Sequence, residues 1–198
     1  VGSSAGNALT TGTRNVAVGI LALGTEDGGS NNTAIGAYAL QTQNAGADAY
    51  NVGVGYAPGA SLTTGVHNIA IGYAMTTHQT GHRNIAIGHT AMNDTNHHAD
   101  TLASIDNIFV GFQSGGGTWE TNDCNYNVAI GNYSMDAAMN GAEYNVGVGH
   151  AVLSSLTTGD NNIAVGNHAG VQITTGSSNT AVGHRALYAV PTTDFNTA

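Results

Sequence analysis

The chain contains no lysine, and its only cationic side chains are Arg14, Arg83 and Arg185. Twelve Asp and Glu residues give a formal net charge of −9, and charged residues make up 8% of the 198 positions, against about 25% in an ordinary soluble domain. A nucleic-acid binder needs clustered Lys and Arg to displace counterions, so nucleic acid is excluded as a partner. Shortage of positive charge also disfavours an anionic membrane surface. No apolar run approaches the roughly 18 residues that span a bilayer, so we expect no membrane insertion.

Aromatic residues and cysteine are also scarce. Aromatics make up 6% of the chain, and long aliphatic residues are diluted by Ala, Gly, Thr and Asn, so a thick globular core is not expected. Cys124 is the only cysteine, which excludes an intrachain disulfide framework. The absence of Lys removes the usual amine partner of an isopeptide bond. Stability must therefore come from stacking, from hydrogen-bond ladders and from association between chains.

Glycine is abundant, with 29 residues, and much of it belongs to a repeated motif. The motif is Asn, a β-branched residue, a small residue, Val or Ile, then Gly. Its ten copies are 15–19, 32–36, 51–55, 68–72, 84–88, 107–111, 127–131, 145–149, 162–166 and 179–183. The Asn-to-Asn spacings are 17, 19, 17, 16, 23, 20, 18, 17 and 17. A period near 18 is too short for helical repeats or for propeller blades.

A second half-motif follows each Gly, as in Ala39-Leu40 and Ala91-Met92, and a polar turn such as Thr63-Thr64-Gly65 often comes next. Each repeat thus predicts a strand, a Gly corner, a short strand and a turn. This pattern predicts an all-β fold: one parallel β-solenoid over residues 1–198, of about eleven coils averaging 18 residues. Strand alternation is expected to place the β-branched residue and the following Val or Ile inside the coil. Stacked coils should align the Asn residues in a ladder, and the Gly should supply a corner with positive φ.

The residue between the two branched positions is uniformly small. It is Gly in two copies, Phe109 in one, and Ala in the other seven, which are Ala17, Ala34, Ala70, Ala86, Ala129, Ala164 and Ala181. Such smallness indicates that another backbone passes close by. Two explanations are open: a cramped corner within one chain, or close packing against neighbouring chains of a parallel oligomer. We expect the second, with these seven alanines in interchain packing.

The two ends of the sequence complement each other. The chain opens on Val1-Gly2, the last two residues of a motif, and closes on Asn196-Thr197-Ala198, the first three. Joining them would write another complete motif, with a spacing of 17 from Asn196 to the next copy of Asn15. We expect either subunits that stack end to end or one period of a longer chain, and both produce a fibre.

The motif Asn-x-Ala-(Ile/Val)-Gly-x-x-(Ala/Ser) resembles the head repeat of trimeric autotransporter adhesins, which is associated with a left-handed parallel β-roll on a three-chain bundle. The longer form, Thr-Thr-Gly-x-x-Asn-x-Ala-Val-Gly-x-x-Ala-Leu, is similar to repeats in phage tail fibres and large bacterial surface proteins. The resemblance covers nearly the whole chain. It implies a lateral homotrimer, adhesion, and an extracellular, cell-surface or virion location. The adhesin-head coil is shorter, near 14 residues, and the stalk, neck and anchor segments of that family are absent from this sequence.

Two consecutive coils are enlarged, at about 93–106 and 115–126, and a ligand site is predicted where their insertions bulge together. The residues that predict it are Asp94, His97, His98, Asp100, Trp119, Glu120 and Asp123. An exposed aromatic platform rimmed by acids suits a sugar, so a cell-surface glycan is the expected ligand. The alternative is that solenoid loops tolerate insertions without any function.

Other chemistries find little support in the sequence. Adjacent histidines on a strand point in opposite directions, so we expect no metal site, and we expect no cofactor and no enzymatic activity. Glu120 with Asp123 is the one carboxylate pair near an aromatic that would suit a glycan-degrading spike. Thr-Thr pairs that recur along the coils leave an ice-binding solenoid as another alternative. The favoured function is a structural fibre or adhesin shaft of an extracellular filament or phage tail fibre.

Overall fold

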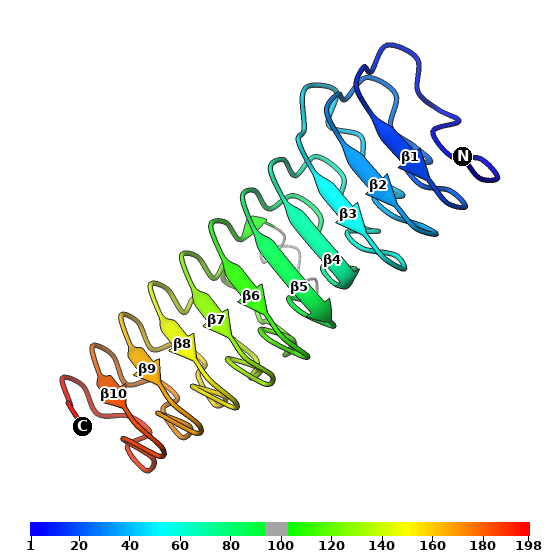
Figure 1. Cartoon of the computed structure of the whole chain (residues 1–198). Helices are drawn as coiled ribbons and strands as arrows, with labels where there is room; N and C mark the ends of the chain where they lie inside the picture. The colour runs from blue at the N-terminus through cyan, green and yellow to red at the C-terminus, as the bar shows by residue number, and fades with distance from the viewer. Residues whose placement is uncertain (94–102) are drawn as a thin grey trace.

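The computed structural model describes residues 1–93 and 103–198, and these form one sheet of ten parallel strands (Figure 1). The strands follow one another across the sheet in chain order, as expected for a solenoid. They are β1 (Val16–Val18), β2 (Thr33–Ile35), β3 (Val52–Val54), β4 (Ile69–Tyr73), β5 (Ile85–His89), β6 (Ile108–Val110), β7 (Val128–Ile130), β8 (Val146–Val148), β9 (Ile163–Val165) and β10 (Thr180–Val182). Each strand coincides with one copy of the Asn-to-Gly motif, and β4 and β5 extend one residue beyond its Gly, so the predicted all-β solenoid is confirmed.

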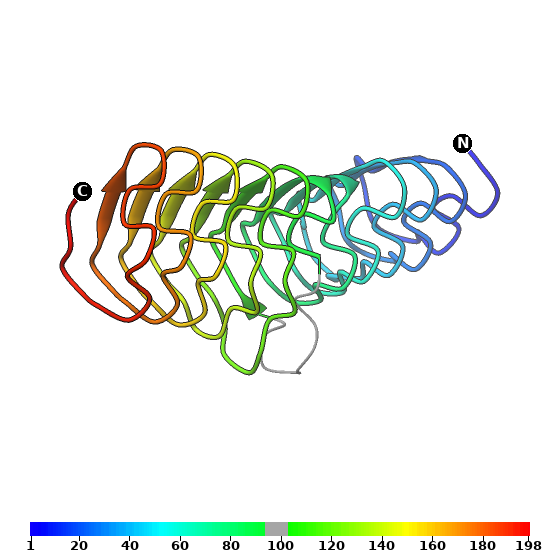
Figure 2. The same cartoon turned by 90° about the horizontal axis from the view of Figure 1, so that it is seen from below.

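Equivalent motif positions lie side by side. Ala17 of β1 pairs with Ala34 of β2, and Ala34 pairs with Gly53 of β3. The ten strands define about nine turns, fewer than the eleven coils counted in the sequence. At the C-terminal end Thr197 pairs with Thr180 only through an isolated bridge. Figure 2 shows the coils stacked along one axis, with the two termini at opposite ends of an elongated rod.

The half of each coil that follows the corner Gly forms consecutive turns, so the second short strand predicted there is wrong for the described coils. In this half of most coils two residues adopt left-handed backbone angles, as Leu21 (φ 54°) and Leu23 (φ 48°) do after Gly19. Left-handed residues interrupt an extended strand, yet the axial bonds persist: the N–H of Leu23 donates to the carbonyl of Ala39 at 3.0 Å. Within residues 1–93 and 103–198, no helix has the length and hydropathy needed to cross a membrane.

The glycine that ends each motif forms the expected corner with positive φ. Gly36 has a φ of 127°, and a Cβ added there would lie 1.7 Å from the carbonyl oxygen of Gly55 in the next coil. Stacked corners therefore leave no room for a side chain, and the backbone angle independently favours glycine.

The orientation predicted for the strand residues is wrong, because the small middle residue points into the coil and the branched residues point out. Of the seven alanines expected in interchain packing, Ala17 is half-buried and the others are fully buried within one chain, namely Ala34, Ala70, Ala86, Ala129, Ala164 and Ala181. Val18, by contrast, is 41% exposed. The interior is narrow, and buried turn residues such as Leu40 and Met92 already fill it, so only a methyl group fits opposite them. The alanines therefore pack inside their own chain.

The motif asparagines form the predicted ladder, buried along the inner edge of the sheet. The side-chain oxygen of each Asn accepts a hydrogen bond from the backbone N–H of the next, for example Oδ1 of Asn145 from the N–H of Asn162 at 2.9 Å. The Nδ2 of Asn145 donates to the carbonyl of Gly159 at 2.9 Å and to Oδ1 of Asn127 at 3.1 Å. Each turn of the solenoid is thus tied to its neighbours by buried amide groups.

Candidate functional site

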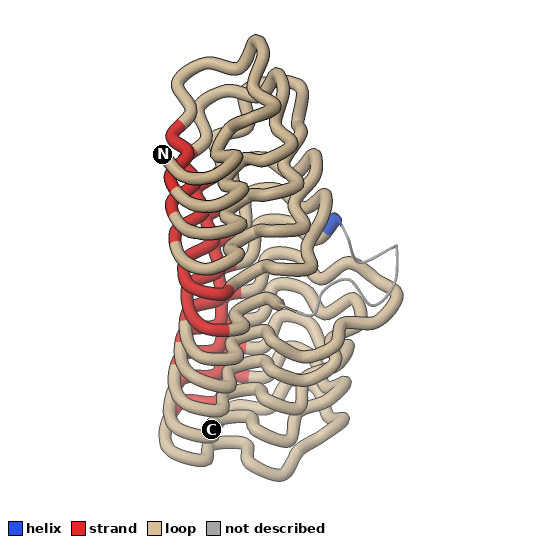
Figure 3. Tube along the Cα trace, turned by 90° about the vertical axis from the view of Figure 1, so that its right-hand side faces the viewer, coloured by secondary structure: helices blue, strands red, loops and turns tan. Residues whose placement is uncertain are grey.

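The largest candidate surface is the outer face of the sheet, which lies along one side of the rod (Figure 3). It presents two columns of side chains, which we call the outer columns. The first column consists of Val16, Thr33, Val52, Ile69, Ile85, Ile108, Val128, Val146, Ile163 and Thr180. The second consists of Val18, Ile35, Val54, Ile71, Ile87, Val110, Ile130, Val148, Val165 and Val182. All but two Thr positions are Val or Ile, and no charged residue interrupts either column.

A row of rings follows the corner glycines along the rod, and we call it the aromatic ladder. It consists of Tyr38, Tyr56, Tyr73, His89, Phe112, Tyr133, His150 and His168, with successive ring centroids 5.4 to 6.1 Å apart. Tyr73 and His89 end β4 and β5, where strand alternation places them on the same face as the branched residues. The apolar surface thus extends beyond the outer columns on this side.

A further column of side chains, formed by the residue before each motif Asn, lies on the side of the outer columns opposite the aromatic ladder. Tyr50 stacks on His67 with ring centroids 5.2 Å apart, and Tyr126 stacks on Tyr144 at 4.8 Å. Between these two pairs, Nε and Nη2 of Arg83 donate to the two carboxylate oxygens of Asp106 at 2.7 and 2.8 Å. This fork of hydrogen bonds raises the pKa of Arg83 and lowers the pKa of Asp106.

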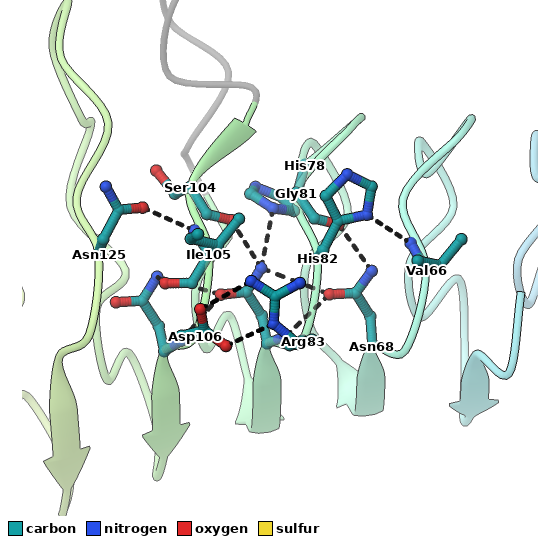
Figure 4. A network of polar contacts seen from close by, with 12 residues as sticks. Val66, Asn68, His78, Gly81, His82, Arg83, Ser104, Ile105, Asp106 and Asn125 are labelled. Atoms are coloured by element: carbon teal, nitrogen blue, oxygen red, sulfur yellow. Dashed lines mark hydrogen bonds and ion pairs between the residues drawn. The ribbon is translucent and has the colours of Figure 1, made fainter.

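Behind this column, the interior around β4 and β5 contains a polar network (Figure 4). The Nδ2 of Asn84 donates to the carbonyl of Ser104 at 2.8 Å and lies 3.3 Å from Nε2 of the fully buried His78. Burial, the largest cause, lowers the pKa of His78 to about 4, so its imidazole is neutral near pH 7. Burial also lowers the pKa of His82, whose Nδ1 accepts a hydrogen bond from the backbone N–H of Val66. These side chains satisfy one another and the backbone, so the network supports the fold.

The predicted loop site loses its aromatic platform. Trp119 is fully buried and packs edge-on against Phe109, with ring centroids 5.7 Å apart. Phe109 occupies the inner position where the other motifs have Ala or Gly, and a Cβ added at Gly115 would lie 2.4 Å from its ring. The longer coil, which extends beyond its neighbours in Figure 2, thus makes room for two large rings in the core. The prediction of an exposed Trp119 that binds a sugar is therefore wrong.

Two other residues of the predicted site, Glu120 and Asp123, belong to the same coil as Trp119, and the remaining four lie outside the described residues. Glu120 is exposed, and its Oε2 accepts a hydrogen bond from Nδ2 of Asn140 at 3.3 Å, while Asp123 is half-buried. Asp94, His97, His98 and Asp100 lie outside the described residues. Among residues 1–93 and 103–198 there is neither a pocket nor a cluster of three His, Cys, Asp or Glu side chains able to hold a metal ion.

In the Thr-Thr pairs on which an ice-binding surface would depend, the first hydroxyl bonds to the next coil, whereas the second Thr, as at Thr64 and Thr158, is exposed. The hydroxyl of Thr63 donates to the carbonyl of Gln79 at 3.2 Å, and that of Thr157 donates to the carbonyl of Thr174 at 3.1 Å. Cys124 is also internal, and its burial raises the pKa of the thiol to about 12. A thiol that stays protonated and buried is a poor nucleophile.

The outer columns were not predicted from the sequence, because strand alternation alone had assigned the branched residues to the interior. A signal was available in the sequence. Both faces of each strand are apolar, so the volume of the side chains had to decide which face lies inside, and the small residues fit the narrow interior. Comparisons of the chain with protein-family models, with curated proteins and with solved structures found no match.

Proposed function

We propose that this chain is a shaft segment of an extracellular fibre, in which copies of the chain associate laterally through the outer columns. The observation that carries the proposal is the continuity of two Val and Ile columns over all ten strands. In a single chain no member is buried: some are exposed, as with Ile130 at 42% and Ile163 at 46%, and the others are half-buried. A soluble monomer seldom leaves such a continuous apolar surface in water.

The size of the face supports an interface between proteins. Ten strands at about 4.8 Å make it roughly 45 Å long, and two side-chain columns with the adjoining aromatic ladder make it roughly 15 Å wide, or roughly 700 Å². The largest apolar patch on a typical monomer is about 300–600 Å². A stable complex buries about 800 Å² on each partner, so the outer face is close to the area that one partner needs.

A second copy of the same chain is the occupant that this face fits best. The columns repeat with the coil rise, and only a surface with the same repeat matches their ridges along the whole length of the rod. The columns hold no charge, so an anionic or cationic polymer gains nothing from them. A homotrimer is the proposed stoichiometry, in line with the resemblance to trimeric adhesin heads.

A fibre shaft also suits the remaining properties of the chain. The Asn ladder repeats its axial contacts from turn to turn, and Thr hydroxyls add further axial bonds in several turns, so the rod can lengthen by repetition. Location on a cell surface or a virion, and adhesion through the protruding coil near Glu120, follow from the resemblance and are part of the proposal. Continuation along the axis, by end-to-end stacking or within a longer chain, completes the proposed filament.

The proposal is tested by charge substitutions on the outer columns. Ile130→Lys combined with Val165→Lys places two cations on the face while leaving the interior intact. The matched control is Thr11→Lys combined with Thr158→Lys, which adds the same charge at exposed turn positions away from the sheet. Sedimentation gives the mass of the assembly, and far-ultraviolet circular dichroism reports the fold.

We expect the wild type and the control to sediment as oligomers and the outer-column variant to sediment as a folded monomer. A wild-type chain that stays monomeric at all accessible concentrations would contradict lateral association. An outer-column variant that keeps the wild-type mass would place the interface elsewhere on the rod.

A further inference from the structure

Tyr126 and Tyr144 form the closest ring pair among the described residues. Their centroids are 4.8 Å apart, about one coil rise, and their planes differ by 7°. Tyr126 is 40% exposed and Tyr144 is 52% exposed. Two phenols thus lie face to face at the surface, in consecutive turns.

The backbone fixes this superposition. Both residues precede a ladder asparagine and have nearly identical left-handed φ angles, 59° and 58°. The N–H of Asn145 donates to Oδ1 of Asn127 at 3.1 Å, and the N–H of Tyr144 donates to the carbonyl of Asn125 at 3.2 Å. Because these bonds hold adjacent turns in register, the backbone keeps the two rings paired.

We propose that Tyr126 and Tyr144 are a site of oxidative cross-linking, at which a dityrosine bond forms between consecutive turns of one chain. The described chain has no disulfide, and the sequence has no lysine for an isopeptide bond, so a tyrosine bond is the covalent staple its composition permits. Both side chains are substantially exposed, so an oxidant in solution can reach them. The cross-link lies within one chain and does not depend on lateral association.

The reaction needs a two-electron oxidant, and hydrogen peroxide with a peroxidase supplies it. Each phenol loses one electron and its hydroxyl proton to give a phenoxyl radical. The two radicals join through a carbon–carbon bond between ring carbons next to the oxygens, and the hydrogens on those carbons move to the oxygens to restore both phenols. The peroxide takes up two electrons and two protons and leaves as two water molecules.

Other rings in the chain provide internal comparisons. Tyr50 stacks on His67 at 5.2 Å with planes 6° apart, which is nearly the same geometry with one phenol missing. Tyr56 and Tyr73 are both phenols, but their centroids are 6.1 Å apart and their planes differ by 28°. Coupling should therefore favour the Tyr126–Tyr144 pair.

The test treats the full chain with peroxidase and hydrogen peroxide and then cleaves it after glutamate. Cleavage after Glu120 and Glu143 places Tyr126 in the peptide 121–143 and Tyr144 in the peptide 144–198. We expect these two peptides to be joined, at a mass lower than their sum by two hydrogen atoms, with dityrosine fluorescence. Tyr144→Phe keeps the stacked ring and should abolish the joined product, whereas Tyr50→Phe, the matched control in the same column, should leave it unchanged. His67→Tyr supplies the missing phenol and should raise the dityrosine yield.

The proposal is overturned if the treated wild type contains no joined peptides, or if Tyr144→Phe leaves them unchanged. Cross-links found only between chains, as a dimer under denaturing conditions, would equally contradict a staple within one chain.

Discussion

The inner and outer faces of the same sheet differ in the residues that they carry and in how far those residues are buried and hydrogen-bonded within one chain. On the inner face, Ala86 and Asn84 are fully buried, and the Asn amide is hydrogen-bonded to neighbouring turns. On the outer face, Ile85 and Ile87 of the same strand remain half-buried in a single chain. One five-residue motif thus holds each turn to the next with its small and amide groups, and presents its branched groups for contact with another molecule.

The largest effect is expected from enlarging the inner face. Ala70→Leu combined with Ala86→Leu forces two large side chains into an interior that Leu and Met residues already fill, which should lower the free energy of unfolding by about 2–6 kcal/mol. Urea unfolding measures it, with Ile69→Leu combined with Ile85→Leu as the outer-face control. If Ala70→Leu combined with Ala86→Leu unfolds like the wild type but loses its oligomeric state, the alanines would face another chain, as the sequence had predicted.

Removing one rung of the Asn ladder should have the next largest effect. Asn145→Ala leaves the buried N–H of Asn162 and the carbonyl of Gly159 without this partner, at a cost of about 1–3 kcal/mol for each group. Asn32→Ala is the matched control, because Nδ2 of Asn32 is buried without a hydrogen-bond partner and there is less to lose. Equal losses in the two variants would show that the ladder amides do not contribute through their hydrogen bonds.

Lowering the pH should reduce the free energy of unfolding through a group in the interior, His78, before it affects the outer face. Because the pKa of His78 is lowered from 6.5 to about 4, its contribution to stability is complete above pH 6.5 and is lost as the pH falls toward 4. The loss is about 3 kcal/mol. Unfolding measured from pH 7 to pH 4 should show it, and His78→Leu should reduce it, since Leu62 occupies the equivalent place over Gly65 in the preceding turn. His82 contributes in the same direction and stays in both proteins, whereas Asp106 acts at lower pH. An unchanged pH profile in His78→Leu would assign the acid sensitivity to other groups.

The smallest effect on folding is expected on the outer face. In the dissociated chain, Ile130→Lys with Val165→Lys should change the free energy of unfolding by no more than about 0.5 kcal/mol for each site, because both side chains remain in water. The comparison is made at protein concentrations low enough for the wild type to dissociate. A large loss of stability in the isolated chain would mean that these residues also hold the coil together.

Much of this architecture was predictable from the sequence. The ten motif copies locate every strand, their order across the sheet follows from the repeat, and Asn and Gly mark the ladder and the corner. The direction of the side chains was not predictable from alternation, because a period of two residues separates two faces without saying which is inside. Ala34 and Ile35 are both apolar, so hydropathy did not show which of the two faces lies inside. Side-chain volume decides it, because only the small residue fits the interior.

The turns and the candidate site were harder to predict for specific physical reasons. Left-handed backbone angles at bulky residues such as Leu23 and Tyr126 have no sequence signature, because such residues rarely adopt them. The long coil around Trp119 was interpreted as a binding loop, whereas its extra length accommodates Phe109 and Trp119 in the core. Sequence length alone does not show whether the extra residues of a coil expose their aromatic side chains or bury them in the core.

The most direct test of the central claim is a reconstruction of the assembled protein by electron cryomicroscopy. We expect rods in which the outer columns of adjacent copies face one another across a dry interior, with the polar turns on the outside. A reconstruction in which Val and Ile of the outer columns face solvent along the rod would contradict it.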